Sequence, residues 1–251
     1  MAGTPFAEGK AGHSDAMTPI PTHAMVLAAG LGLRLRPITD TIPKPLVVVA
    51  GRTMLDRVLD HLDQVGCGHK VVNTHWLAGK IETHLAARRD ISLSFEPELL
   101  ETGGGVAKAM PMLGSQPFYV CNADIIWDDR GQSALARLAA AFDPERMDGI
   151  LLLQNVETAF GYEGKGDFHL AGDGRLSRRK PDETTPYLFA GVQILHPRLI
   201  QDHPAGAFSL NLLYDRAMAA DRLFGLVHDG GWYHVGTPEA LAEADRLLGR
   251  R

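Results

Sequence analysis

The sequence contains only two cysteines, Cys67 and Cys121, among 251 residues. Two cysteines in distant segments provide no disulfide framework, which favours a reducing compartment, so we expect a cytoplasmic protein. No apolar run approaches the ~20 residues that a helix needs to cross a bilayer, so we expect no membrane partner. Basic residues are not in excess either, because the formal net charge is -5. This charge argues against nucleic acid as the main partner.

Residues 1–22 are rich in Gly, Pro, Ala and Ser, and they lack the apolar middle of a signal peptide. We expect them to form a flexible N-terminal tail without chemistry. The remaining residues, 23–251, have an ordinary apolar and charged content and are numerous enough to bury a substantial core. We therefore expect them to form a single domain.

Short apolar runs alternate with segments whose apolar residues recur at helical spacing. The segments expected to be strands are 23–29, 69–73, 91–95, 117–121, 150–154, 168–170, 175–177, 187–195 and 223–228. The segments expected to be helices are 53–65, 77–85, 106–112, 133–142, 211–220 and 237–248. This alternation is typical of βαβ units, so it predicts an α/β fold with a mostly parallel sheet.

The first expected strand leads into the sequence Gly30-Leu31-Gly32-Leu33-Arg34, and Pro43-Lys44-Pro45 follows it. A glycine-rich loop after a strand presents backbone N–H groups that an anion can approach closely. Arg34 adds a planar fork of donors, and Lys44 adds a compact point charge. The stretch therefore predicts a phosphate-binding loop.

Two well-known phosphate loops do not match this stretch. A dinucleotide fingerprint requires a third glycine where the sequence has Leu35. A Walker A loop requires Gly-Lys-Ser/Thr after four spacer residues, and none follows. The loop must therefore belong to another class of phosphate-binding protein.

The pattern G-x-G-x-R, then P-x-T, then P-K-P resembles the sugar-1-phosphate nucleotidyltransferases. The signature positions of that family that this chain fills are Gly30, Gly32, Arg34, Pro37, Thr39, Pro43, Lys44 and Pro45. The resemblance implies a Rossmann-like nucleotide-diphospho-sugar transferase fold, with a nucleotide-binding part over about residues 23–130 and a small sugar-binding lobe within about 131–251. It also implies that a nucleoside triphosphate and a sugar 1-phosphate react to an NDP-sugar and pyrophosphate.

Roles for individual residues follow from the same resemblance. Arg34 and Lys44 would be catalytic, with Arg34 on the leaving pyrophosphate and Lys44 between the two reacting phosphates. The residues that would bind the nucleotide are Leu27, Ala28, Ala29, Gly30, Gly32, Glu101, Gly104, Gly105 and Asn122.

The segment Leu100-Glu101-Thr102-Gly103-Gly104-Gly105 precedes an expected helix that begins at Val106. A triple glycine that opens a helix is a second candidate cradle for an anion or nucleotide, and a plain flexible loop is the alternative. The sequence of this segment resembles that of the N-acetylmuramate-1-phosphate uridylyltransferases, which implies UTP and N-acetylmuramate 1-phosphate as substrates. Mannose-1-phosphate guanylyltransferase and glucose-1-phosphate uridylyl- or thymidylyltransferase remain alternatives.

A carboxylate, Asp124, follows the strand expected over 117–121. Ligands bind at the carboxyl ends of parallel strands, and carboxylates suit Mg²⁺, so Asp124 is a candidate metal ligand in line with the resemblance. The family motif Trp-x-Asp-x-Gly-Thr supplies a second metal ligand, but His234 stands at its Asp position. Imidazole favours Mn²⁺ or another softer metal. Either His234 binds such a metal, or the metal rests on Asp124, water and phosphates, or the enzyme is weakened.

The sugar side rests on fewer residues. Lys180-Pro181 matches a family motif whose lysine holds the sugar phosphate, although Arg179 replaces the preceding glutamate; a solvated basic turn is the alternative. Gly191 lies in the segment that would run under the sugar. The lactyl carboxylate of N-acetylmuramate calls for a basic residue, for which Arg178 or Arg179 is a candidate.

A protein of another class also fits the sequence, namely a catalytically weak nucleotide-binding regulatory subunit. His234 favours it, whereas Arg34, Lys44 and Asp124 favour an enzyme. The oligomeric state does not follow from the sequence.

Overall fold

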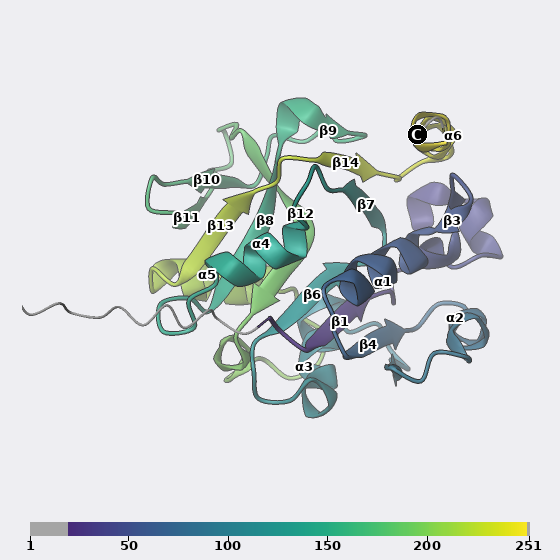
Figure 1. Ribbon diagram of the computed structural model, residues 1–251, viewed down its shortest axis with the longest axis horizontal. Coiled ribbons are helices and arrows are strands. Elements are labelled where there is room, and N and C mark those ends of the chain that lie inside the picture. The colour runs from purple at the N-terminus through teal and green to yellow at the C-terminus, as the bar shows by residue number, and fades with distance from the viewer. Residues whose placement is uncertain (1–19, 250–251) are drawn as a thin grey trace, which may run out of the picture.

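Residues 20–249 are described by a computed structural model (Figure 1). The tail expected over 1–22 lies almost entirely outside these residues. The helices are α1 Met54–Gln64, α2 Ala78–Leu85, α3 Glu101–Leu113, α4 Ala134–Ala141, α5 Asn211–Ala219 and α6 Pro238–Leu248. The strands are β1 His23–Leu27, β2 Val48–Val49, β3 Arg52–Thr53, β4 His69–Thr74, β5 Ile91–Phe95, β6 Phe118–Asn122, β7 Ile125–Asp128, β8 Gly149–Asn155, β9 Ala159–Phe160, β10 Phe168–Leu170, β11 Leu176–Arg178, β12 Tyr187–Leu195, β13 Leu223–Val227 and β14 Gly231–His234. None of the described helices has the length and apolar character of a membrane span.

A nine-stranded sheet forms the centre of the fold (Figure 1). β1 pairs in parallel with β4 on one side and β6 on the other, and β4 pairs in parallel with β5. The antiparallel pairs gather around β12, which pairs with β6, β8 and β10. The predicted α/β fold with a mixed, largely parallel sheet is confirmed.

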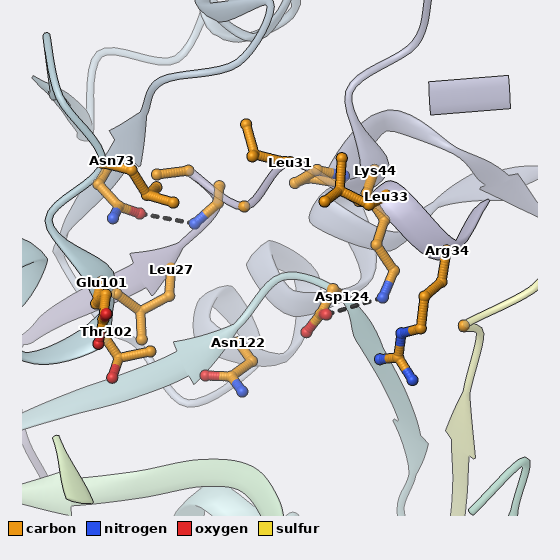
Figure 2. A pocket seen from close by; sticks show the side chains of 17 residues that line it. Leu27, Leu31, Leu33, Arg34, Lys44, Asn73, Glu101, Thr102, Asn122 and Asp124 are labelled. Atoms are coloured by element: carbon orange, nitrogen blue, oxygen red, sulfur yellow. Dashed lines mark hydrogen bonds and ion pairs between the residues drawn. The ribbon is translucent and has the colours of Figure 1, made fainter. Parts of the chain in front are cut away.

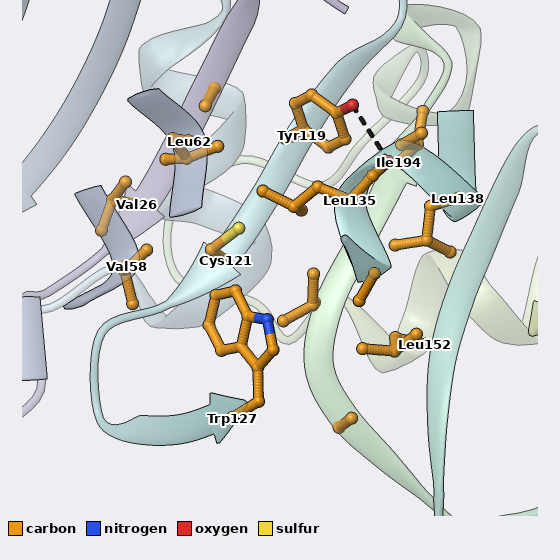
Figure 3. Packing of buried hydrophobic residues seen from close by; sticks show 14 of the residues in the cluster. Val26, Val58, Leu62, Tyr119, Cys121, Trp127, Leu135, Leu138, Leu152 and Ile194 are labelled. Atoms are coloured by element: carbon orange, nitrogen blue, oxygen red, sulfur yellow. Dashed lines mark hydrogen bonds between the residues drawn. The ribbon is translucent and has the colours of Figure 1, made fainter. Parts of the chain in front are cut away.

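Helices cover both faces of this sheet, because successive residues of a buried strand point to opposite sides. Ala24 and Val26 of β1 join a core beneath α1, α2 and α4, whereas Met25 joins a second core beneath α3 and α5. Figure 3 shows the first core, in which the Tyr119 hydroxyl donates to the backbone oxygen of Leu135 at 3.1 Å. Both cores hold the carboxyl ends of β1 and β6 in fixed positions.

A small sheet in the order β7-β14-β9 was not expected from the sequence. β14 runs antiparallel to β7, with His234 opposite Ile125. Because Ile125 directly follows Asp124, this pairing brings the C-terminal motif next to the carboxyl end of β6. The strands are short and pair over long sequence distances, so the local pattern did not predict them.

Of the apolar run over 46–49, only Val48 and Val49 form a strand, β2, since the preceding residues form a 3-10 helix, Lys44–Leu46, in which Pro45 has no N–H to donate to a strand. One expected boundary is wrong. The helix expected from Val106 begins at Glu101, so the three glycines lie inside the first turns of α3. The other expected helices lie within a few residues of the observed ones.

Candidate active site

The predicted phosphate-binding loop follows β1 and folds tightly against Lys44. Gly32 adopts a left-handed conformation (φ 64°), and the Thr39 hydroxyl donates to its backbone oxygen at 2.8 Å. A Cβ atom on Gly32 would lie 3.0 Å from the Cβ of Lys44, so the close approach favours glycine there. The loop and the P-K-P segment are therefore packed against one another, as a shared phosphate site requires.

The loop opens into a cavity of about 530 Å³ (Figure 2). This volume lies within the range of small-molecule sites. The residues that line this first cavity are Leu27, Ala28, Ala29, Gly30, Leu31, Gly32, Leu33, Arg34, Lys44, Pro45, Asn73, Leu99, Glu101, Thr102, Asn122, Asp124 and Gly236. Most of the residues predicted to bind the nucleotide therefore share one cavity with the two predicted catalytic residues.

Lys44 and Asp124 form an ion pair on the wall of this cavity. Nζ of Lys44 lies 2.8 Å from Oδ2 of Asp124 (Figure 2). The lysine side chain is 9% exposed and the carboxylate 40% exposed. Burial raises the pKa of Asp124, but the charge of Lys44 and its hydrogen bond outweigh burial and hold that pKa below its usual value. Asp124 is therefore ionised at neutral pH.

A second cavity of about 540 Å³ adjoins the first. Its lining residues are Arg34, Asn122, Asp124, Ile125, Gly161, Tyr162, Glu163, Gly164, Asp167, Leu188, Phe189, Gly191, Trp232, His234, Gly236, Thr237 and Ala240. The residues that line both cavities are Arg34, Asn122, Asp124 and Gly236. Two ligands, one in each cavity, would meet at these residues.

Gly191 occupies the place in β12 where the strand is irregular. The register with β8 shifts between Phe189 and Gln193, and Gly191 has a left-handed backbone (φ 79°). A Cβ atom there would lie 3.1 Å from both Nδ2 of Asn122 and Cγ1 of Ile125. Glycine thus lets β12 pass close to the end of β6 and leaves the second cavity open.

His234 lies at the edge of the second cavity and contacts Arg34. Nε2 of His234 is 3.3 Å from Nη2 of Arg34. Burial lowers the pKa of His234, and the positive charges of Lys44 and Arg34 lower it further, against the opposing charge of Asp124. The ring is therefore neutral at neutral pH.

The metal-binding capacity of the site centres on Asp124. Among residues 20–249, no group of three or more His, Cys, Asp or Glu side chains is placed to hold a metal ion. Mg²⁺ often binds through one or two carboxylates while substrate phosphates and water supply its other ligands. The ionised Asp124, which lines both cavities, fits a divalent cation that arrives with a phosphate.

The glycines at 103–105, predicted to cradle an anion or nucleotide, are packed inside α3 in this structure. The N–H groups of Gly103 and Gly104 donate to the backbone oxygen of Phe208 at 2.8 and 3.1 Å, so they are already used. Gly104 and Gly105 are buried on α3 and line neither cavity. A Cβ atom on Gly103 would lie 2.3 Å from a ring carbon of Phe208. Glu101 does line the first cavity, as predicted.

The basic residues predicted for the sugar side lie outside both cavities. The Lys180 side chain is 80% exposed, and its Nζ lies 3.5 Å from Oε1 of Glu183. Arg178 pairs with Asp215 at 2.6 Å, and Arg179 donates to backbone oxygens such as that of Gly166. The structure thus favours the solvated basic turn for this segment.

Sequence reasoning missed several lining residues. Asn73 accepts a hydrogen bond from the N–H of Ala28 at 2.7 Å and donates to Glu96 at 2.7 Å (Figure 2 shows the first contact). Glu96 is fully buried and also accepts from the N–H of Leu100 at 3.0 Å. A polar residue inside an apolar strand was the signal for Asn73. No comparable local signal marked Glu163 or Asp167 in the second cavity.

Comparison with known proteins decides the family. Residues 23–250 match the family model described as nucleotidyl transferase. The chain belongs to this nucleotidyl transferase family. The chain is 40% identical over 239 residues to N-acetylmuramate alpha-1-phosphate uridylyltransferase of Caulobacter vibrioides, covering 92% of this chain and 99% of that one. It is 36% identical over 233 residues to the enzyme of the same name from Neisseria meningitidis, covering 90% and 98%.

Solved structures agree on the nucleotidyl transferase fold. A putative glucose-1-phosphate thymidylyltransferase from Bacillus anthracis, crystallised with sucrose, superposes with a TM-score of 0.78 at 17% identity. The match covers 91% of this chain and 96% of that one. At 17% identity this likeness concerns the fold alone, and it extends over nearly the whole length of both chains.

Proposed function

We propose that this nucleotidyl transferase joins UTP and N-acetylmuramate 1-phosphate to give a UDP-sugar and pyrophosphate. The observation that carries the reaction type is that two cavities meet at Arg34 and Asp124, with Lys44 beside them. The choice of substrates is supported by the printed names of the two relatives at 40% and 36% identity. The reaction would be a step of nucleotide-sugar synthesis. It would take place in the cytoplasm and serve the recycling of cell-wall peptidoglycan.

The two parts of the domain would divide the substrates. The nucleotide would occupy the first cavity, whose lining comes from residues 27–124 apart from Gly236. The sugar would occupy the second cavity, whose lining comes mainly from residues 161–240. This supports a nucleotide-binding part over about 23–130 and a sugar-binding part over about 131–251.

The reaction would be an attack of the sugar-phosphate oxygen on the α-phosphorus of UTP, with pyrophosphate as the leaving group. Both substrates are anions, so the protein mainly has to align them and neutralise charge where it develops. Lys44 would hold the α-phosphate and the incoming phosphate, and Arg34 would stabilise the leaving pyrophosphate. No protein nucleophile is required, because the attacking oxygen is already ionised at neutral pH.

A divalent cation, Mg²⁺ by preference, would be held by Asp124 together with substrate phosphates. When bound, it would supply Lewis-acid stabilisation of the phosphate oxygens. Asp124 suits this role because it is ionised and faces both cavities. Mn²⁺ or another divalent ion remains an alternative if His234 takes part.

The sugar assignment has a specific point to test. N-acetylmuramate carries a lactyl carboxylate, yet Arg34 is the only Lys or Arg in the described lining of the second cavity, which also contains Glu163 and Asp167. A neutral amino sugar without the lactyl group therefore belongs in the assay. Mannose and glucose 1-phosphates stand for the alternative activities.

The deciding experiment is a panel of four nucleoside triphosphates against four sugar 1-phosphates: N-acetylmuramate, N-acetylglucosamine, mannose and glucose. Pyrophosphate release is measured with Mg²⁺ and with Mn²⁺. We expect the highest kcat/KM for UTP with N-acetylmuramate 1-phosphate. A higher value for any other pair would reject this substrate assignment, and tight UTP binding without pyrophosphate release from any pair would favour a regulatory subunit.

A further inference from the structure

Arg34 stands at the boundary of the two cavities, and its position needs an explanation because its side chain is long and exposed. Of the described residues, only His234 has a side chain within hydrogen-bond distance of the Arg34 guanidinium. Guanidinium groups only donate, so Nε2 of His234 must be the acceptor and the ring proton must lie on Nδ1. The contact therefore defines both the direction of the hydrogen bond and the tautomer.

The backbones beside these two residues are fixed by a common core. Leu35 and Val235, their immediate neighbours, are both fully buried in the same small hydrophobic cluster, which also includes Ile126 of β7. The backbones at these two positions therefore have little freedom to move apart. The packing thus keeps the attachment points of the Arg34 and His234 side chains close together.

The His234 ring is also held by its surroundings. It stacks on Trp232, with centroids 6.1 Å apart and planes inclined by 13°. A Cβ atom on Gly236 would lie 2.7 Å from Nε2, and one on Gly161 would lie 2.4 Å from the His234 backbone oxygen. The chain therefore has glycines at the two places where a side chain would displace this residue.

We propose that His234 is a positioning residue for Arg34, holding the guanidinium at the junction of the two cavities, where the phosphates of both substrates meet. This inference rests on the proposed function, since it assumes phosphates at that junction. A neutral acceptor fixes the guanidinium but leaves its full positive charge for phosphate oxygens. A carboxylate in the same place would neutralise part of that charge.

The same geometry separates His234 from the metal. Nε2 has one lone pair, and this lone pair is used by Arg34, while Nδ1 carries the proton. The ring therefore has no free donor atom for a cation while the contact persists. The cation would depend on Asp124 and the phosphates, as in the proposed function.

A double-mutant cycle tests whether His234 acts through Arg34. His234→Phe keeps an aromatic ring but removes the acceptor, and we expect it to lower kcat/KM by about tenfold. In the Arg34→Ala background the same change is expected to have less than about a twofold effect, since there is no guanidinium left to hold. His234→Gln, whose Oε1 can take the place of Nε2, is expected to stay within about threefold of wild type. His234→Leu serves in place of the Phe variant if the latter does not fold.

The metal and the nucleotide provide a second readout. UTP binding measured by calorimetry in the presence of a chelator is expected to weaken in His234→Phe but not in His234→Gln, and the Mg²⁺ concentration for half-maximal activity is expected to stay unchanged. Equal losses in both Arg34 backgrounds, a Gln variant as damaged as the Phe variant, or a strongly raised Mg²⁺ requirement would each overturn the proposal. Absence of turnover by the wild type would instead reject the proposed function. The UTP affinities of the same variants would then still test the contact between His234 and Arg34.

His203→Phe is the matched control. His203 is exposed, stacks on Phe208 at 5.6 Å with planes inclined by 12°, and lines neither cavity. Its replacement changes the same residue type in a similar stacked setting without touching Arg34. We expect this variant to keep wild-type kcat/KM and UTP affinity, and a loss equal to that of His234→Phe would show that the effect is unspecific.

Discussion

Nζ of Lys44 lies 2.8 Å from Oδ2 of Asp124, which joins the 3-10 helix after the phosphate loop to the end of β6. The two residues are separated by 80 positions in the sequence. Their contact places a positive charge and a candidate metal ligand on one wall of the first cavity. The chemistry of the site is therefore concentrated at the carboxyl ends of neighbouring parallel strands, where open α/β sheets bind their ligands.

Replacing Lys44 by alanine removes the positive charge proposed to bridge the two reacting phosphates. We expect Lys44→Ala to retain less than roughly 1% of wild-type kcat, because a contact of this kind to a developing charge contributes about 10²–10³ in rate. The measurement is steady-state pyrophosphate release at saturating substrates. Near-normal turnover would mean that Lys44 is not catalytic.

Replacing Lys180 by alanine is the companion experiment. This lysine is 80% exposed and lies outside both cavities, paired only loosely with Glu183. Exposed ion pairs contribute little to stability, so the variant is expected to fold normally. We expect its KM for the sugar phosphate to stay within about threefold of wild type. A KM increase of ten times or more would show that Lys180 reaches the sugar phosphate in the working enzyme.

Replacing Gly105 by alanine should disturb the wall of the first cavity from behind. The new Cβ would lie 2.8 Å from Oε1 of Glu96 and 2.9 Å from Nδ2 of Asn73, the pair that fixes the N–H of Ala28. We expect a loss of about 1–3 kcal/mol in the free energy of unfolding by urea. The KM for UTP should rise as well, because Ala28 lines the cavity.

Gly79→Ala is the control for this substitution. Gly79 lies in α2, and a Cβ atom there would meet nothing within 4 Å. Alanine is better than glycine in a helix by up to about 1 kcal/mol, so this variant should be as stable as wild type or slightly more stable. If both variants lost stability equally, the crowding at Gly105 would not be the cause.

The stability of the fold should decrease in acid through a charged cluster at the amino-terminal ends of β4 and β5. Asp90 accepts hydrogen bonds from Arg88 and from the buried Lys70. The hydrogen bond from Arg88 is the largest cause that holds the pKa of Asp90 well below its usual value, and Lys70 lowers it further against the effect of burial. A carboxylate with a depressed native pKa stabilises the fold above its unfolded pKa, and this contribution is lost as the pH falls towards the native pKa.

We therefore expect the free energy of unfolding to fall as the pH is lowered from about 5 to 2. Urea titrations across this range, monitored by tryptophan fluorescence, provide the measurement. Asp90→Asn should be less stable than wild type at pH 7, and its stability should depend less steeply on pH. An identical pH dependence in the two proteins would exclude this cluster as a source of acid sensitivity.

The sequence by itself determined the parts of the protein that depend on local patterns. The alternation of apolar runs with segments of helical spacing predicted the parallel sheet, and the end of the strand over 117–121 predicted the place of Asp124. Both predictions were possible because the spacing of apolar residues, the turn residues and the strand ends are encoded within a few neighbouring residues. The spacing of Arg34 and Lys44 around the glycine loop likewise predicted the phosphate site. These elements needed no knowledge of distant contacts.

Only the tertiary structure decided which of the remaining candidates reach the site. The glycines at 103–105 serve helix packing because Phe208 and Glu96 lie against them, and Lys180 lies outside the cavities because the turn that carries it pairs locally with Glu183. Arg34 and His234, 200 residues apart, meet because a shared core holds the 3-10 helix of Arg34 next to β14, whose place is set by the small sheet. Such contacts depend on how separate segments pair and pack, and no local pattern in the sequence encodes them.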